Sequence, residues 1–153
     1  AANIGALINA EAFEFHGDDY QSPEFPVEEY VRERVLAGAR VSAATRQRIL
    51  DERSEIQSAF QRDIQEFDAL ITPTTHSTAI PVTQVDGVVN AAHFTRPFNF
   101  LGMCAVAVPI GLTSMGLPTS LQIAARSGDE AVALRIGAAF EKERGPFGVP
   151  LGH

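Results

Sequence analysis

The sequence predicts an α/β fold in which helices cover both faces of a β-sheet. Two apolar segments of strand length, residues 104–110 and 121–124, are joined by residues 111–118, which are rich in Gly, Pro, Ser and Thr. In the first segment, which contains A-V-A-V-P-I, apolar residues occupy successive positions instead of alternating, a pattern typical of strands covered on both faces. Segments with helical periodicity precede and follow this pair, and they would supply the covering layers.

Three helices are predicted before the first strand. Residues 3–16 form the first helix, which ends at Gly17. Residues 27–37 form the second, which ends at Gly38. Ser42 is predicted to cap a third, longer helix that reaches about residue 66. The apolar stripe of the first helix comprises Ile4, Leu7, Ile8, Ala12 and Phe15.

A short buried strand and a polar segment follow these helices. Residues 68–74 form the strand, and their proline ends it. Residues 75–90 are a polar excursion with a tight turn at Asp86-Gly87. Residues 91–101 are predicted to form a short helix that Pro97 breaks.

The last predicted helix carries the only lysine of the chain. Ser127 or Asp129 caps this helix, which runs through about Lys142. Lys142 lies on the polar side near the frayed end, so it should remain solvated and protonated. A catalytic serine needs a base within hydrogen-bond reach, and a solvated lysine is a poor one. A Ser–Lys dyad within this chain is therefore not expected.

Composition excludes several classes of function. The net charge is −7, and no basic run suggests a nucleic-acid surface. No apolar stretch approaches the roughly 20 residues of a membrane helix, so a cytoplasmic protein is expected. The single cysteine, Cys104, cannot form an internal disulfide and is interpreted as a core thiol.

The four histidines do not indicate a metal centre. His16, His76, His93 and His153 lack the spacing of helical or Cys-x-x-Cys ligand sets, so no metal or cofactor is expected. His16 is interpreted as a cation at a helix C-terminus. His76 and His93 either line a ligand site or make structural polar contacts.

Three polar segments adjoin the predicted strands. Residues 72–76 and 111–113 follow strands, and residues 95–99 precede one. Ligands of open α/β sheets tend to bind at strand ends, so these segments are the candidate site. The alternative is that they are ordinary loops whose polar groups cap one another.

At these residues the chain resembles the C-terminal third of the amidase signature family. The order of the motifs carries the resemblance, and it covers nearly the whole chain. The motifs are D-A-L-I-T-P-T (68–74), T-R-P-F-N-F-L-G (95–102), V-P-I-G (108–111), G-L-P-x-x-L-Q (116–122) and the D-E that opens the final helix (129–130).

The resemblance implies part of a large mixed β-sheet between helical layers and a catalytic centre elsewhere. Family members hydrolyse amides with a Ser–cis-Ser–Lys triad in which one serine attacks, the second relays the proton and the lysine is the base. This chain has no adjacent serine pair and no lysine before Lys142. Residues 1–153 are therefore expected to be the C-terminal portion of such a domain, with no catalytic residue of their own and the upstream portion as partner.

The family's substrate cleft adjoins segments that match two of the polar segments. The resemblance therefore implies substrate-binding roles for one set of side chains and predicts a small-molecule amide as substrate. The set comprises Thr74, Thr75, His76, Thr95, Arg96 and Asn99.

Amidotransferase A subunits, which release ammonia from glutamine, are also similar. In them an arginine aligned with Arg34 binds the substrate carboxylate, so Arg34 completes the implied substrate-binding set. Their acidic residue for the substrate amine falls at Ala91-Ala92-His93 here. An arginine without its acidic partner leaves an ammonium unpaired, so a substrate other than glutamine is expected.

Two interpretations of the whole chain remain. The chain is either one part of a longer amidase or a stand-alone non-catalytic binding protein of amidase descent. Strands that are apolar on both faces need neighbours, so a chain of this size would expose apolar surface and could form a homodimer.

Overall fold

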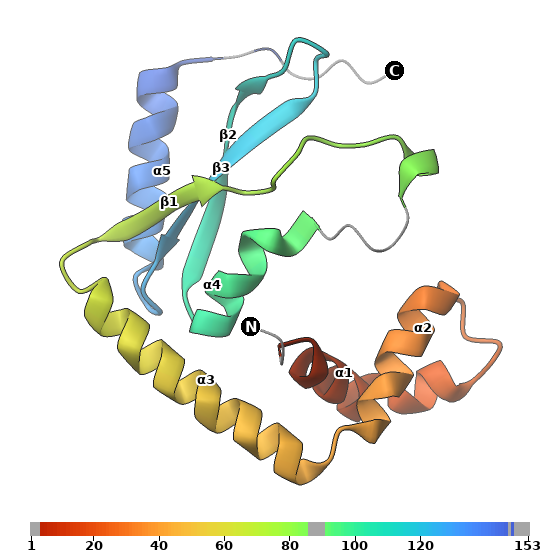
Figure 1. Ribbon diagram of the computed structural model, residues 1–153. Helices are drawn as coiled ribbons and strands as arrows, with labels where there is room; N and C mark the ends of the chain where they lie inside the picture. The colour runs from red at the N-terminus through yellow and green to blue at the C-terminus, as the bar shows by residue number, and fades with distance from the viewer. Residues whose placement is uncertain (1–3, 86–90, 147, 149–153) are drawn as a thin grey trace. The chain divides into compact units, whose positions relative to one another are not determined.

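The computed structural model describes residues 4–85, 91–146 and 148, and it divides the chain into two compact units within one long helix. Unit 1 comprises residues 1–58 and unit 2 comprises residues 59–153. The predicted turn at Asp86-Gly87 lies outside the described residues. Figure 1 labels the helices and strands.

Unit 1 contains helices α1 (Ile4–Gln21) and α2 (Glu29–Leu36), the 3₁₀ turn η1 (Ala37–Arg40) and the first part of α3 (Ala43–Asp63). Helix α1 packs against α2 and η1. Ser42 caps α3 as predicted, because its Oγ accepts a hydrogen bond of 3.1 Å from the backbone N–H of Thr45. A half-buried arginine, Arg32, closes the loop between α1 and α2 by donating to the carbonyls of Tyr20, Ser22 and Phe25.

The predicted end of the first helix was wrong. Helix α1 continues through Gly17 to Gln21. Gly17 is buried under the ring of Phe13, whose Cε2 atom lies 2.8 Å from where a Cβ would be placed. Glycine costs about 1 kcal/mol within a helix, and here it allows the ring to cover the backbone. Phe15, assigned to the apolar stripe, is 78% exposed.

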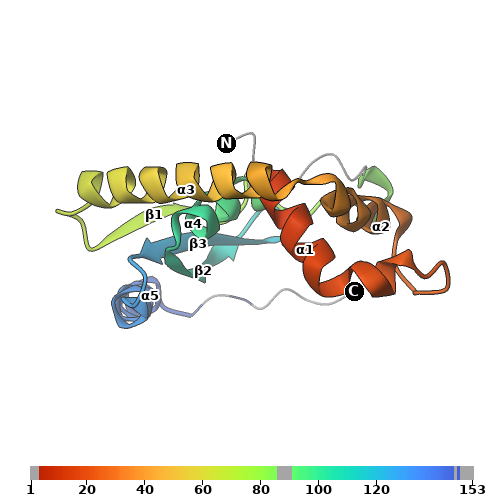
Figure 2. The same cartoon turned by 90° about the horizontal axis from the view of Figure 1, so that it is seen from below.

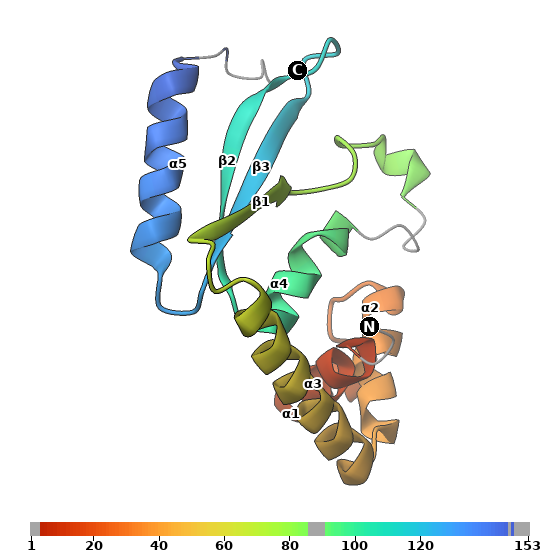
Figure 3. The ribbon, with the colours of Figure 1, turned by 60° about the vertical axis from the view of Figure 1, so that its left-hand side comes forward.

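Unit 2 contains a three-stranded sheet of order β1-β3-β2. The strands are β1 (Ala69–Pro73), β2 (Cys104–Leu112) and β3 (Pro118–Ala125). Both pairings with β3 are antiparallel, so β1 and β2 run in the same direction. Figure 3 shows the β2–β3 hairpin beside helix α5 (Glu130–Arg144).

Helices lie on both faces of this sheet, which confirms the predicted α/β class. Helix α5 packs on one face, where Val108, Ile123, Ala125 and Ala133 form the buried core. Helix α4 (Thr95–Leu101) contacts β2 and begins on the opposite face (Figure 2). Coverage of the strands is partial, since Ile71 on β1 is 62% exposed.

The helix predicted over residues 91–101 is broken before Pro97 and not at it. A 3₁₀ turn, η3 (Ala91–His93), contains a kink at Ala92, and α4 starts at Thr95. Pro97 lies in the first turn of α4, where a missing N–H removes no helical hydrogen bond. Gly102 ends α4 in the left-handed conformation with φ 69°.

Candidate functional site

Two of the three polar segments meet at one edge of the sheet. Pro73, at the end of β1, pairs with Leu121, and Leu112, at the end of β2, pairs with Pro118. Because the intervening strand is antiparallel to both, the carboxyl ends of β1 and β2 point the same way. Residues 74–79 and the β2–β3 turn therefore lie at the same edge, as predicted for residues 72–76 and 111–113.

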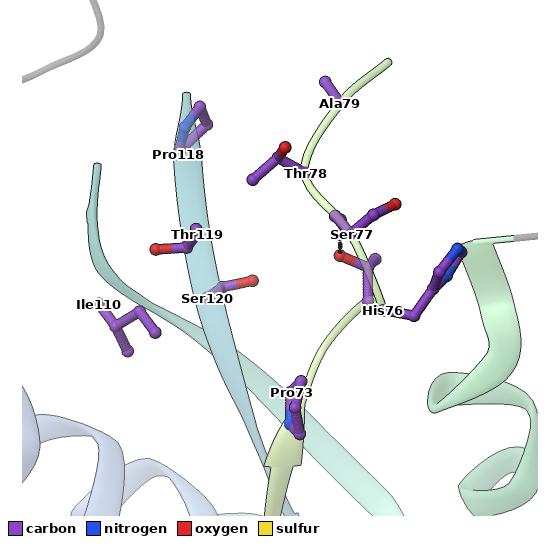
Figure 4. Close-up of a pocket in the computed structure, with 10 residues that line it drawn as sticks. Pro73, His76, Ser77, Thr78, Ala79, Ile110, Pro118, Thr119 and Ser120 are labelled. Atoms are coloured by element: carbon purple, nitrogen blue, oxygen red, sulfur yellow. Dashed lines mark hydrogen bonds between the residues drawn. The ribbon is translucent and has the colours of Figure 1, made fainter. Parts of the chain in front are cut away.

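A pocket of about 340 Å³ opens between residues 73–79 and the start of β3 (Figure 4). Most of its side chains carry hydroxyl groups or are small and apolar. No Asp, Glu, Lys or Arg is among the described residues that line it. Its lining comprises Pro73, Thr75, His76, Ser77, Thr78, Ala79, Ile110, Pro118, Thr119 and Ser120.

Hydroxyl contacts order this pocket. The Ser120 Oγ atom donates to Thr74 Oγ1 at 2.9 Å, and the Thr74 N–H donates to the Ser120 carbonyl at 3.2 Å. Thr75 Oγ1 donates to the Ser77 carbonyl at 2.7 Å, which folds the segment back on itself. Figure 4 shows the Ser120 side chain directed toward residues 73–79 and the Thr119 side chain directed the other way. The two walls are thus joined by short polar contacts.

A second pocket, of about 310 Å³, adjoins the same segment. Residues 75–80 line it together with Val85 and Ala91, so its wall is more apolar. Thr75 and His76 belong to both pockets. The ring of His76 points away from β3 in Figure 4. The segment that contains the predicted Thr75 and His76 therefore lines two cavities.

The third predicted segment does not line either pocket. Thr95 and Arg96 are half-buried and Asn99 is exposed, all three on α4. The structure links this helix to the rest of the site through Gln122 on β3, which is 4% exposed. Its Nε2 atom donates to Thr72 Oγ1 and to the Phe94 carbonyl, each at 3.2 Å.

Sequence reasoning missed Ser120 and Gln122. Both occur in the G-L-P-x-x-L-Q motif, and polar Ser120 and Gln122 alternate with apolar Leu121 and Ile123. That alternation places them on one face of β3. The alternation of polar and apolar residues could have identified Ser120 and Gln122 from the sequence.

Arg34 belongs to unit 1 and is described within it. Its Nη1 atom donates to the Tyr30 hydroxyl at 3.1 Å, and its guanidinium lies 5.4 Å from the centre of the Tyr30 ring. This stacking and hydrogen bond hold the half-buried side chain along α2. A carboxylate role for Arg34 stays a prediction.

Within the described segments, no group of three or more His, Cys, Asp or Glu side chains is arranged to hold a metal ion. Lys142 is exposed in the last turn of α5. Cys104 is half-buried, and its Sγ atom lies 3.2 Å from the Arg126 carbonyl. No helix among the described residues has the length and apolar character needed to cross a membrane.

Comparison with known proteins identifies the family of this chain. The sequence model of the amidase family, described as Amidase, matches residues 12–134. The chain belongs to the amidase family.

This amidase-family chain is similar to proteins that differ in their described activities. The A subunit of glutamyl-tRNA(Gln) amidotransferase from Mycobacterium ulcerans is 35% identical over 127 residues, which make up 76% of the chain and 26% of that protein. Acylamidase of Rhodococcus erythropolis is 29% identical over 150 residues, which make up 92% of the chain and 31% of that protein.

A solved structure shows the same fold. Allophanate hydrolase of Kluyveromyces lactis matches 92% of the chain with a TM-score of 0.80 and 20% identity. At that identity the likeness concerns the fold alone. The match covers 25% of that hydrolase, so the chain spans about a quarter to a third of these relatives.

Proposed function

We propose that this chain is the C-terminal, substrate-pocket-forming part of an amidase that hydrolyses the C–N bond of a carboxylic amide. In this proposal a Ser–cis-Ser–Lys triad outside residues 1–153 performs the chemistry. The observation that carries the proposal is the amidase-family match over residues 12–134, in a chain that corresponds to 31% of an acylamidase.

The positions of the lysine and the serines support the proposal that the catalytic triad lies outside this chain. The single lysine, Lys142, is exposed on α5, and no two serines are adjacent in the sequence. A nucleophilic serine requires a positioned base. The hydroxyl-lined pocket offers hydrogen bonds to an amide, and the ring of its histidine, His76, points away from β3, the strand that carries Ser120 (Figure 4). Binding and orienting the substrate is the role that remains for these residues.

The substrate-binding set of this proposal keeps the residues expected from the sequence. Thr74, Thr75 and His76 contribute from the end of β1, and Thr95, Arg96 and Asn99 contribute from α4. Arg34, on α2 in unit 1, keeps its expected substrate-binding role. Neutral hydroxyl groups favour an uncharged polar substrate portion because they offer no counter-charge. A simple acyl amide therefore suits the pocket better than a zwitterionic amino acid.

A comparison of two polypeptides tests the proposal. The isolated chain and the protein encoded by its complete reading frame are incubated with an acyl anilide, and release of the aniline is measured. We expect turnover by the complete protein and none by residues 1–153. Turnover by the isolated chain would place a nucleophile within it and refute the proposal.

A glutamine-hydrolysing amidotransferase is the second candidate. The 35% identity with the amidotransferase chain of Mycobacterium ulcerans favours it. In such proteins the arginine aligned with Arg34 needs an acidic partner, and Ala91-Ala92-His93 supplies none. Glutaminase activity of the complete protein that is lost in Arg34→Ala would establish this candidate and exclude the first.

A non-catalytic binding protein of amidase descent belongs to another class. Intact mass of the protein purified from its native source decides this alternative. A polypeptide of 16.5 kDa that binds amides without turnover would support it. A larger mass, with an upstream serine pair and lysine, supports the amidase. A cytoplasmic location and a homodimer remain parts of the proposal.

A further inference from the structure

Gln122 is a buried polar side chain on a strand whose other buried residues are apolar. It is 4% exposed and lies between Leu121 and Ile123 on β3. Because neighbouring side chains of a strand point to opposite faces, and Ile123 packs toward α5, Gln122 points to the face on which α4 begins.

Two elements meet at its amide nitrogen. Nε2 donates to Thr72 Oγ1 on β1 and to the backbone carbonyl of Phe94, which directly precedes α4. The carbonyl can only accept a hydrogen bond, so the nitrogen of the amide must face it. The Thr72 hydroxyl can donate or accept and adapts to either group. The contact with Phe94 thus sets the orientation of the side chain.

We propose that Gln122 is a positioning residue that holds the start of α4 against the carboxyl end of β1. The inference rests on the proposed function, since α4 carries Thr95, Arg96 and Asn99 and the end of β1 leads to Thr74 and Thr75. The hydrogen bonds of Gln122 go to Thr72, two residues before Thr74, and to Phe94, directly before Thr95. Gln122 fixes the distance between the two sets through the Thr72 hydroxyl and the Phe94 carbonyl.

Ser120 makes a second side-chain hydrogen bond between β3 and the segment that follows β1. Ser120 lies two residues before Gln122 on the same face of β3 and donates to Thr74 at 2.9 Å. Ser120 and Gln122 therefore tie β3 to β1 at successive positions, but Gln122 alone of the two also reaches α4. An apolar residue of similar volume would fill the core without fixing α4, because apolar contacts have no preferred direction.

Three variants separate the two hydrogen bonds. Gln122→Met keeps the length of the side chain and removes both. Gln122→Glu keeps its shape and the contact with Thr72, whose hydroxyl can donate to the carboxylate, but it sets an oxygen against the Phe94 carbonyl. Thr72→Val removes the strand contact and leaves the contact with Phe94.

Hydrogen exchange of the protein that contains this chain measures the position of α4. The amides of Gly102 and Met103, which donate to the Asn99 and Phe98 carbonyls, report on the helix end. We expect exchange about tenfold faster in both Gln122 variants, the effect of losing about one hydrogen bond. Thr72→Val should change it less than about twofold. Unchanged exchange in Gln122→Met, or equal acceleration in α5, would overturn the inference.

Kinetics test the functional part. For amide hydrolysis we expect both Gln122 variants to raise KM about fivefold and to change kcat less than about twofold, because misplaced binding groups weaken ground-state binding. Faster exchange with an unchanged KM would refute the positioning role. If the unsubstituted protein hydrolyses no amide, the proposed function fails, and the exchange measurements still decide whether Gln122 holds α4.

Discussion

A close backbone contact at Gly38 gives the sharpest test of the structure of unit 1. Gly38 lies in η1, where this turn packs against α1. A Cβ atom at this position would lie 2.0 Å from the Asn9 carbonyl oxygen and 2.7 Å from the Phe13 Cβ. Both atoms belong to α1. Gly38→Ala must therefore move η1 away from the helix.

The magnitude follows from two opposing effects. Replacing glycine by alanine at a compatible site stabilises a protein by about 0.4–1 kcal/mol, because the unfolded chain loses freedom. Overpacking costs about 1–3 kcal/mol, and it approaches the upper value where the neighbour is backbone and cannot rotate away. We expect Gly38→Ala to lower the free energy of unfolding by about 2 kcal/mol, a large part of an ordinary stability.

Urea denaturation followed by far-ultraviolet circular dichroism measures this change. Gly5→Ala is the matched control because it lies in α1 and a Cβ there would meet no atom within 4 Å. That control should raise the free energy of unfolding by about 0.5–1 kcal/mol. A Gly38→Ala protein as stable as the Gly5→Ala protein would show that η1 and α1 do not pack as described.

Two further substitutions test single contacts. Arg126→Met removes a guanidinium whose Nη2 atom donates to the carbonyls of Ile64, Gln65 and Phe67, just after α3. This substitution should lower the free energy of unfolding by about 2 kcal/mol. An unchanged urea midpoint would contradict this prediction. Ser42→Ala removes the cap of α3 and should cost about 1 kcal/mol, whereas Ser42→Gly should cost only a few tenths; equal losses would argue against a cap.

The sequence predicted the ends of helices and strands correctly where a single capping or strand-ending residue sets them. Ser42 caps α3, and Pro73 ends the first strand, both as predicted. The prediction that Gly17 ends the first helix failed because this glycine is needed for packing: the ring of Phe13, one turn earlier, covers it. The prediction of a break at Pro97 failed because a proline in a first turn does not disrupt a helix.

The site was predicted in part for a related reason. Residues 72–76 and 111–113 were predicted to form a site because both follow strands. They lie at the same edge of the sheet because β3 is antiparallel to both β1 and β2, so the ends of β1 and β2 point the same way. The same logic could not place residues 95–99, which precede a strand. Their connection to the site depends on Gln122, and a single sequence does not show which buried polar residue reaches which carbonyl.

The separation of binding from chemistry has a kinetic consequence at His76. This residue borders both pockets, and its ring points away from β3 (Figure 4). If the triad lies outside this chain, His76 contributes to binding and takes no proton in the reaction. In the complete protein, His76→Gln should raise KM about threefold and leave kcat within about twofold, because only uniform binding is lost. A loss of kcat of about a hundredfold or more, typical of a removed general base, would instead place this histidine in the chemistry.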